Sequence, residues 1–300
     1  MAQVVAVRAA RPRGTVRWRR RPTLGQALIV VALLLIFFVT AYPFFFILSF
    51  AVMPYKNYVS QPIHALPSGF TLLYFQQLLN TPQLTHAFAI SALKTGVGTV
   101  LNVVCTAMAG YALSRKELRF GRVLTILFLI PLFVGGGLIP YFLVVRATGL
   151  LNTFGALVVP GLVAPFYLFV ARAFFLEYPQ EVIEAAHIDG SGHFAIFWRI
   201  IWPTSVPILA TMAMLYGINH WNEYFWPSFL VQQNLYPATV VLQALITNRD
   251  MLAGLGLNQQ VASASFVAAM AAVMIIPVLI VYPFLQRYVV RGILLGAIKG

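Results

Sequence analysis

Long, uninterrupted runs of apolar residues constrain the fold of this chain more than any other feature. The first run, residues 27–50, contains no charged residue, and a transmembrane helix needs about 20 predominantly apolar residues. The runs are continuous rather than alternating, which indicates helices and not the strands of a barrel. Charged residues make up 9% of the chain, against roughly 25% in soluble domains. We therefore predict a polytopic membrane protein of the all-α class.

Six apolar runs predict six transmembrane helices. They cover residues 27–50, 86–113, 123–145, 154–175, 202–230 and 261–284. A cleaved signal peptide is the alternative for the first run, but that run exceeds the roughly 7–15 apolar residues of such signals, so we favour a retained helix. We also expect a short interfacial helix at residues 71–79. The chain then divides into a basic tail (1–24), a membrane domain (25–290) and a second tail (291–300).

Basic residues gather in three segments of the chain. These are the tail before residue 24, the loop at residues 115–122 and the end at residues 287–299. Six spans place all three segments on one side, and the positive-inside rule makes that side the cytoplasm. Contact of the basic tail with anionic lipid accounts for the net charge of +13, and nucleic-acid binding is the weaker alternative. We expect both termini to be cytoplasmic.

Signatures of catalysis and of cofactor binding are missing from the sequence. A phosphate-binding P-loop has a lysine directly after a glycine, whereas Lys56, Lys94, Lys116 and Lys299 follow other residues. We find no His, Cys and Asp at metal-ligand spacing, and Cys105 is the only cysteine. We therefore expect no enzymatic activity, no metal and no cofactor bound by this chain.

The segment at residues 176–201 and the residues just after it carry the most specific pattern. Its candidate functional residues are Glu184, Ala185, Ala186, Asp189, Gly190, Ile200 and Pro203. The pattern resembles the EAA motif of ABC-importer permeases, Glu-Ala-Ala-x3-Gly-x9-Ile-x-Leu-Pro, with Trp202 at the leucine position. The resemblance implies a cytoplasmic coupling helix that docks into an ATPase subunit and transmits its closure. An ordinary amphipathic interface helix is the alternative.

The local chemistry of this segment suits a short docking helix. Pro179 is suited to the first position of a helix, and Glu184 then lies in an early turn, where the helix dipole favours a carboxylate. Ala185 and Ala186 are small, so the helix can enter a partner's cleft closely. Gly190 permits the turn that follows.

Other segments extend the resemblance over nearly the whole chain. They are residues 66–72, 110–115, 135–140, 221–224 and 291–300. Together they are similar to the MetI-like, MalG-like carbohydrate permeases of type I ABC importers, and most to the subgroup named for LplC and YtcP. That subgroup is associated with oligosaccharides derived from polysaccharides. The resemblance places the chain in the inner membrane of a bacterium.

The same resemblance implies a set of partners. They are a second, homologous permease, two ATPase subunits that bind ATP and Mg²⁺, and an extracytoplasmic sugar-binding protein. The tail residues Gly296, Lys299 and Gly300 are expected to contact the ATPase dimer.

A substrate path is harder to place from the sequence. Polar residues inside a span are costly and often functional, and the rings of Trp221, Tyr224 and Trp226 can stack on sugar faces. The candidate path residues are Trp221, Asn222, Glu223, Tyr224, Gly136 and Gly137. An interfacial aromatic belt explains Trp221 and Tyr224 equally well. For Lys94 we favour a side chain that extends outward to the membrane interface.

The sequence predicts a permease subunit of an ATP-driven carbohydrate importer. A secondary transporter driven by an ion gradient stays open as an alternative. It would need intramembrane ionisable groups for coupling, and the spans offer only Glu223, His220 and Lys94. A membrane-embedded enzyme or a scaffold is disfavoured by the missing catalytic residues and by the EAA-type segment.

Overall fold

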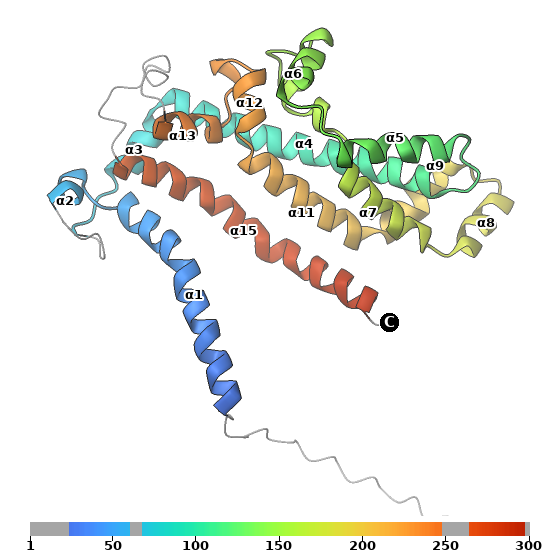
Figure 1. Ribbon diagram of the computed structural model, residues 1–300, viewed down its shortest axis with the longest axis horizontal. Helices are drawn as coiled ribbons and strands as arrows, with labels where there is room; N and C mark the ends of the chain where they lie inside the picture. The colour runs from blue at the N-terminus through green and yellow to red at the C-terminus, as the bar shows by residue number, and fades with distance from the viewer. Residues whose placement is uncertain (1–23, 61–67, 248–263, 298–300) are drawn as a thin grey trace, which may run out of the picture. The chain divides into compact units, whose positions relative to one another are not determined.

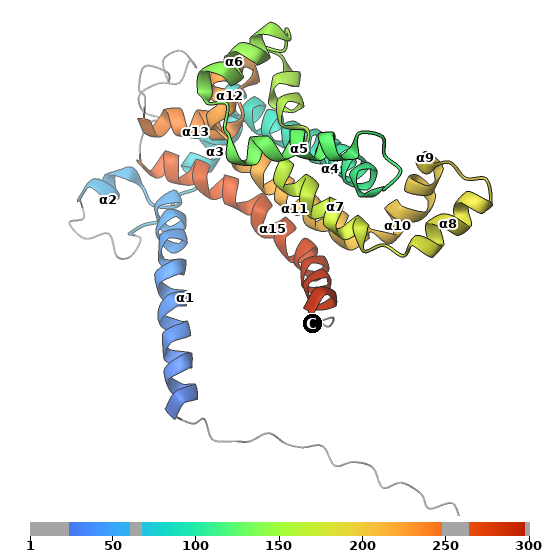
Figure 2. The ribbon, with the colours of Figure 1, turned by 45° about the vertical axis from the view of Figure 1, so that its right-hand side comes forward.

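A computed structural model describes residues 24–60, 68–247 and 264–297 of the 300-residue chain. The described residues form helices joined by turns and contain no strand (Figures 1 and 2). This confirms the predicted all-α class. The chain divides into two units, residues 1–46 and 47–300. The helix α1 (Leu24–Ala51) crosses the boundary between them.

The helices of the second unit follow α1 in this order. The first group is α2 (Tyr55–Ser60), α3 (Leu73–Asn80), α4 (Pro82–Ser114), α5 (Gly121–Phe133), α6 (Leu138–Ala147), η1 (Phe154–Leu157), η2 (Val159–Gly161) and α7 (Pro165–Leu176). The second group is α8 (Gln180–Ile188), α9 (His193–Ile196), η3 (Phe197–Ile201), α10 (Trp202–Thr204), α11 (Val206–Asn222), α12 (Phe225–Leu230), η4 (Gln233–Leu235), α13 (Ala238–Thr247) and α15 (Ala264–Ala297).

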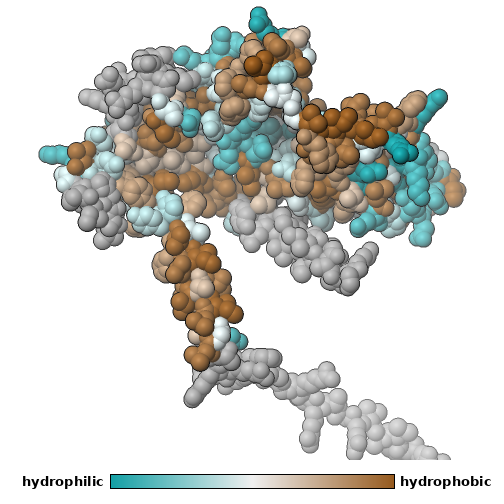
Figure 3. All heavy atoms as spheres, viewed as in Figure 1, coloured by the Kyte–Doolittle hydropathy of each residue, from teal (hydrophilic) through white to brown (hydrophobic). Residues whose placement is uncertain are grey.

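The surface of α1 is apolar along its length. Leu28, Phe38 and Phe45 are all exposed, and Figure 3 shows α1 in the brown of hydrophobic residues. A helix without a polar face cannot bury such a surface in a soluble domain, but lipid can cover it. The exposed side chains therefore support the predicted first span.

The centre of the second unit is a group of long helices. The helix α4 has 33 residues, so at 1.5 Å per residue it is about 50 Å long, which exceeds the roughly 30 Å of membrane hydrocarbon. It packs against α7 and α11, and α11 packs against α15. Figures 1 and 2 both show α8, α9 and α10 at one end of this group, and α3 and α13 at the other.

Two glycines of α4 allow its neighbours to approach closely. A Cβ atom on Gly110 would lie 2.9 Å from Cβ of Ala171 in α7. A Cβ atom on Gly98 would lie 2.6 Å from Nε2 of His220 in α11. Contacts this short essentially never occur for real Cβ atoms, so a side chain at either position would force its neighbour to move. Small residues at helix contacts are typical of membrane bundles.

The number of spans matches the prediction only in part. Three described helices are long and apolar enough to cross a membrane, and the count rises to five if each of two bent helix pairs forms one span. The predicted span at residues 123–145 is two shorter helices, α5 and α6, separated at Gly135, Gly136 and Gly137. The backbone of Gly137 has φ +76°, which glycine adopts readily and other residues avoid. Six spans stay a prediction.

Two smaller predictions can be compared directly with the helices. The expected short helix at residues 71–79 is found as α3. The helix α15 continues to Ala297 and so includes most of the residues predicted as the C-terminal tail, 291–300. Gly296 lies in the last turn of that helix, whereas Lys299 and Gly300 lie outside the described residues.

Candidate functional site

The helix α8 contains the Glu-Ala-Ala residues and is attached to the rest of the unit along one face. Ile183 and Ala186, one turn apart, are buried in an apolar cluster with Tyr111 and Phe175. Ala186 packs inside its own chain. Ala185 is exposed. Ala186 therefore anchors the helix, and the small side chain of Ala185 allows a partner to approach its outer surface closely.

The outer side of α8 carries both charged and apolar residues. Glu184 and Asp189 are exposed. Ile188 is 87% exposed, and Phe194, in the following helix α9, is 67% exposed. Figure 3 shows teal, hydrophilic side chains gathered at the end of the unit that carries α8. Large exposed apolar side chains among polar residues are typical of a protein contact surface.

A glycine ends α8 in a Schellman motif. The N–H of Gly190 donates to the carbonyl of His187 at 2.9 Å, and the N–H of Ser191 donates to the carbonyl of Ala186 at 2.9 Å. The backbone of Gly190 has φ +82°, the left-handed conformation that this motif requires. A Cβ atom there would meet nothing within 4 Å. Backbone conformation, and not space within this chain, therefore requires the glycine.

The end of the motif lies where the chain turns back into the bundle. Ile200 lies in η3, a π-helical turn, and Pro203 lies in α10. The segment from α9 to α10 meets α11 at an angle of 82°. Ile200 packs against the same apolar cluster as α8, and Pro203 is exposed. These two residues shape the connection from α8 to α11.

Arg115 joins α8 to the end of α7 and to α4. It lies just beyond α4, and its Nη2 donates to the carbonyl of Phe175 near the end of α7 at 2.9 Å. Its Nη1 donates to Oε1 of Gln180, the first residue of α8, at 3.3 Å. The guanidinium also lies 5.0 Å from the ring centroid of Tyr111. This side chain therefore contacts all three helices.

A polar cavity of about 260 Å³ lies between α4, α6, α7, α11 and α12 and the short helices before α7. Four aromatic residues line it: Tyr141, Tyr167, Tyr216 and Trp226. The rings of Tyr141 and Trp226 lie 4.0 Å apart at 38°. Pockets that combine aromatic walls with a few polar groups are typical ligand sites.

Buried hydrogen bonds hold the polar wall of this cavity. Asn102 donates through Nδ2 to the carbonyl of Gly161 at 2.6 Å, so its Oδ1 accepts from Nε2–H of His220 at 2.9 Å. The hydroxyl of Tyr216 accepts from the N–H of Ala164 at 3.1 Å. The Nδ1 atom of His220 is buried without a partner. In the neutral imidazole that atom is a hydrogen-bond acceptor.

Glu223, which lines the cavity, is held in an ion pair. Nζ of Lys94 lies 3.3 Å from Oε2 of Glu223 and donates to the carbonyl of Glu223 at 3.3 Å. The hydroxyl of Thr239, in α13, donates to the same carbonyl at 2.9 Å. The Lys94 side chain is 0% exposed and that of Glu223 is 24% exposed. The expected outward extension of Lys94 is therefore wrong, because burial against a carboxylate replaces it.

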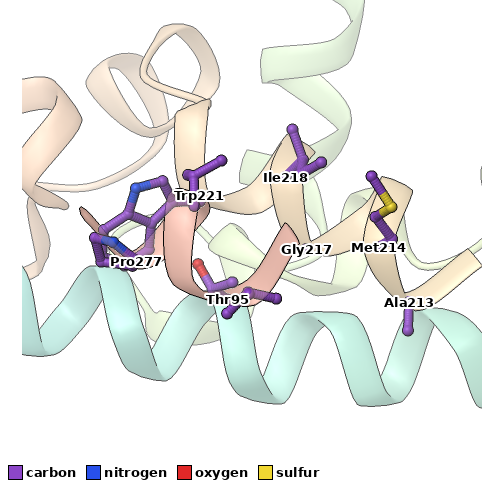
Figure 4. Close-up of a pocket in the computed structure, with 9 residues that line it drawn as sticks. Thr95, Ala213, Met214, Gly217, Ile218, Trp221 and Pro277 are labelled. Atoms are coloured by element: carbon purple, nitrogen blue, oxygen red, sulfur yellow. The ribbon is translucent and has the colours of Figure 1, made fainter. Parts of the chain in front are cut away.

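Of the predicted path residues, only Glu223 lines the cavity. Trp221 lies on another side of α11, where its Nε1 donates to the carbonyl of Met274 at 2.9 Å. There it borders an apolar pocket with Gly217 and Pro277 (Figure 4).

The remaining predicted path residues also lie away from the cavity wall. Asn222 donates to the carbonyl of Ile218 in its own helix, and Tyr224 is exposed. Gly136 and Gly137 lie in the break between α5 and α6. The sequence did not assign Asn102, Tyr141, Tyr167 or Tyr216 to the path, although all four line the cavity. Their polar or aromatic character inside apolar runs was the available signal.

Comparison with known proteins identifies the family. Residues 102–295 match the pattern of the family described as binding-protein-dependent transport system inner membrane component. The chain belongs to this family. The matched range holds α8 with the residues around it and every residue that lines the cavity.

Individual relatives of this chain agree with its assignment to the family. It is 32% identical to Protein LplC of Bacillus subtilis (strain 168) over 87% of this chain and 90% of LplC. It is 29% identical to the polygalacturonan/rhamnogalacturonan transport system permease protein YtcP of the same organism over 92% and 99% of the two chains. The resemblance predicted from residues 135–140 and from the tail is thereby confirmed.

A solved structure extends the similarity to the fold of the permease. It is a crystal structure of a bacterial ABC transporter involved in the import of the acidic polysaccharide alginate. One of its chains is 28% identical to this permease, with a TM-score of 0.77, and the match covers 87% of this chain and 95% of that one. The predicted permease fold is therefore confirmed, and this chain is an inner membrane transport subunit.

Proposed function

We propose that this chain is the permease subunit of an ATP-driven importer for carbohydrates, in particular oligosaccharides derived from polysaccharides. It forms half of the translocation path and docks an ATPase subunit through α8. The observation that carries the proposal is the capped helix α8, anchored by Ile183 and Ala186 and exposed at Glu184, Ala185 and Ile188. The cargoes in the names of YtcP and of the alginate transporter support a carbohydrate.

We infer the partners from the family to which the chain belongs. A second, homologous permease completes the path, and two ATPase subunits bind ATP and Mg²⁺ and hydrolyse the nucleotide. A sugar-binding protein delivers the cargo on the extracytoplasmic side. Both termini of the permease face the cytoplasm, and Gly296, Lys299 and Gly300 contact the ATPase dimer. This chain binds no cofactor of its own.

Arg115 supplies the physical connection between ATP and the path. Closure of the ATPase dimer moves α8, and Gln180 at its start is bound to Arg115. Arg115 is also bound to the end of α7, and α4 and α7 carry Asn102 and Tyr167 in the cavity wall. Because the packed helices move as rigid elements, a shift at α8 alters access to the cavity.

Uptake in reconstituted vesicles tests the proposal. The complex is assembled from this permease and the transport subunits encoded beside it, and ATP is supplied on the side of the ATPases. We expect uptake of labelled oligosaccharide that requires the sugar-binding protein and is blocked by vanadate. Uptake that is insensitive to vanadate but is abolished by a proton or sodium ionophore would establish a gradient-driven transporter instead.

A further inference from the structure

The charges around the polar cavity indicate which sugar chemistry it accommodates. We propose that the cavity contacts an uncharged, hydroxyl-bearing sugar unit of the passing chain, and that Glu223 makes it favour such a unit over a uronic acid. Lys94 is the positioning residue for Glu223. This inference rests on the proposed import function and adds the chemical class of the unit that this subunit contacts.

The aromatic wall supplies a stacking surface. Tyr141 and Trp226 come from different helices, α6 and α12, and their rings lie 4.0 Å apart. Both residues are half-buried, so part of each ring is accessible. The negative face of an aromatic ring attracts the positively polarised C–H groups of a sugar ring. The cavity therefore offers an apolar side to one face of a pyranose.

The polar wall supplies hydrogen-bond acceptors for hydroxyl groups. Glu223 is the only charged residue among the described residues that line the cavity, and its ionised carboxylate accepts hydrogen bonds but donates none. A carboxylate is stabilised by donors that form charge-assisted hydrogen bonds with it. Sugar hydroxyls are such donors.

The positive charge of the ion pair does not face the cavity. Lys94 is fully buried, and its Nζ is directed to two oxygen atoms of Glu223. The hydroxyl of Thr239 holds the same residue from α13. A uronate carboxylate entering the cavity would meet the carboxylate of Glu223 first. Like charges in a site of low dielectric repel strongly, and such contacts are a common source of specificity.

The cavity volume limits how much of the cargo is contacted. At about 260 Å³ it lies just below the roughly 300–1,000 Å³ of pockets that enclose a drug-sized ligand. One sugar unit, and not a whole oligosaccharide, therefore fits against Tyr141, Trp226 and Glu223.

Matched monosaccharide probes test this inference. Methyl galactoside and methyl galacturonoside differ only at C6, as do methyl glucoside and methyl glucuronoside. Saturation-transfer NMR on the assembled permease–ATPase complex in detergent measures their weak binding. We expect saturable binding of at least one neutral glycoside and binding about tenfold weaker, or none, for its uronate. The variant Trp226→Ala should lose binding of the neutral glycoside, and Asn222→Ala, outside the cavity, should keep it.

A charge-neutral double variant isolates the role of Glu223. Lys94→Met with Glu223→Gln removes both charges at once, so neither is left buried alone. We expect the preference for the neutral glycoside to shrink to about twofold or less. Equal binding of the two probes by the unchanged complex, or no binding of either neutral glycoside, would overturn the inference. If such a complex still shows ATP-dependent uptake, only this inference fails and the proposed function stands. If the permease does not bind the ATPase subunits at all, the proposed function fails as well.

Discussion

The guanidinium of Arg115 donates to the carbonyl oxygen of Phe175 at 2.9 Å. This hydrogen bond links the C-terminal end of α4 to the end of α7, directly before the chain enters α8. The same guanidinium reaches Gln180 at the start of α8, and Arg115 itself is only 9% exposed. A buried, charged donor shared between three helices is therefore the junction between α8 and the bundle.

Replacing Arg115 with alanine should uncouple ATP hydrolysis from transport. The change leaves the carbonyl of Phe175 without this donor, and a lost hydrogen bond to a charged group costs about 1.5–3 kcal/mol. We expect the complex to assemble with a lower Tm, and sugar-stimulated ATPase activity to fall severalfold. Arg119→Ala is the matched control, since Arg119 is exposed in the same loop. Equal sugar-stimulated ATPase activity in both variants would show that Arg115 does not couple ATP hydrolysis to transport.

Two nearby glycines of α4 should respond differently to the same change. Gly98→Ala would force a Cβ atom to within 2.6 Å of His220, whereas a Cβ atom on Gly96 meets nothing within 4 Å. We expect Gly98→Ala to lower the Tm of the purified complex by several degrees. Gly96→Ala should leave the Tm unchanged or raise it, since alanine favours a helix by up to about 1 kcal/mol over glycine. Similar melting temperatures would argue against the close contact of α4 with α11.

The ion pair predicts an unequal cost for single and double variants. Lys94→Met alone leaves Glu223 without its buried cation, and breaking a buried pair costs about 3–5 kcal/mol. The double variant Lys94→Met with Glu223→Gln removes both charges and should recover most of that loss. Thermal unfolding of the permease in detergent measures both. A double variant as unstable as the single one would show that the two side chains do not act as a pair.

The sequence predicted well those features that depend on composition or on local backbone chemistry. The continuous apolar runs predicted helices, and the Glu-Ala-Ala residues with Gly190 predicted a short helix that ends at a glycine. Its left-handed backbone, φ +82°, follows from local chemistry alone. The interruption of the predicted span at residues 123–145 also has a local cause, since Gly135, Gly136 and Gly137 favour a break.

Features that depend on contacts between distant segments could not be predicted from the sequence. Lys94 and Glu223 are 129 positions apart, and nothing local indicates that they pair. Ala185 and Ala186 are identical residues, and only the packing of Ile183 beside Ala186 decides which of them is buried. Likewise, Trp221 and Trp226 are both aromatic residues near a helix end, yet only Trp226 lines the cavity. The direction in which α11 and α12 pack makes that distinction.

The orientation of the chain is tested by labelling. Because the three basic segments lie on one side in the six-span arrangement, we expect a cysteine introduced in the first 20 residues, or after Arg291, to react only when the membrane is opened. A cysteine at Lys56, in the predicted outer loop, is the positive control and should react in intact cells. Labelling of either terminus from outside would contradict the predicted orientation.

The central claim is that α8 docks an ATPase subunit. Glu184→Lys reverses a charge on its outer surface, where like-charge contacts can cost several kcal/mol, and Gly190→Pro is incompatible with φ +82°. Two controls match them: Glu177→Lys, exposed in the same loop but outside the motif, and Gly192→Pro, whose φ of −76° suits proline.

Co-purification of the ATPase subunits with each of these four permease variants is the most direct measurement. All four should insert into the membrane in normal amounts, since none of the changed residues lies in a predicted span. The account predicts that Glu184→Lys and Gly190→Pro lose most of the bound ATPase, at least about tenfold, while Glu177→Lys and Gly192→Pro retain it. Normal recovery of the ATPase subunits with both Glu184→Lys and Gly190→Pro would contradict it.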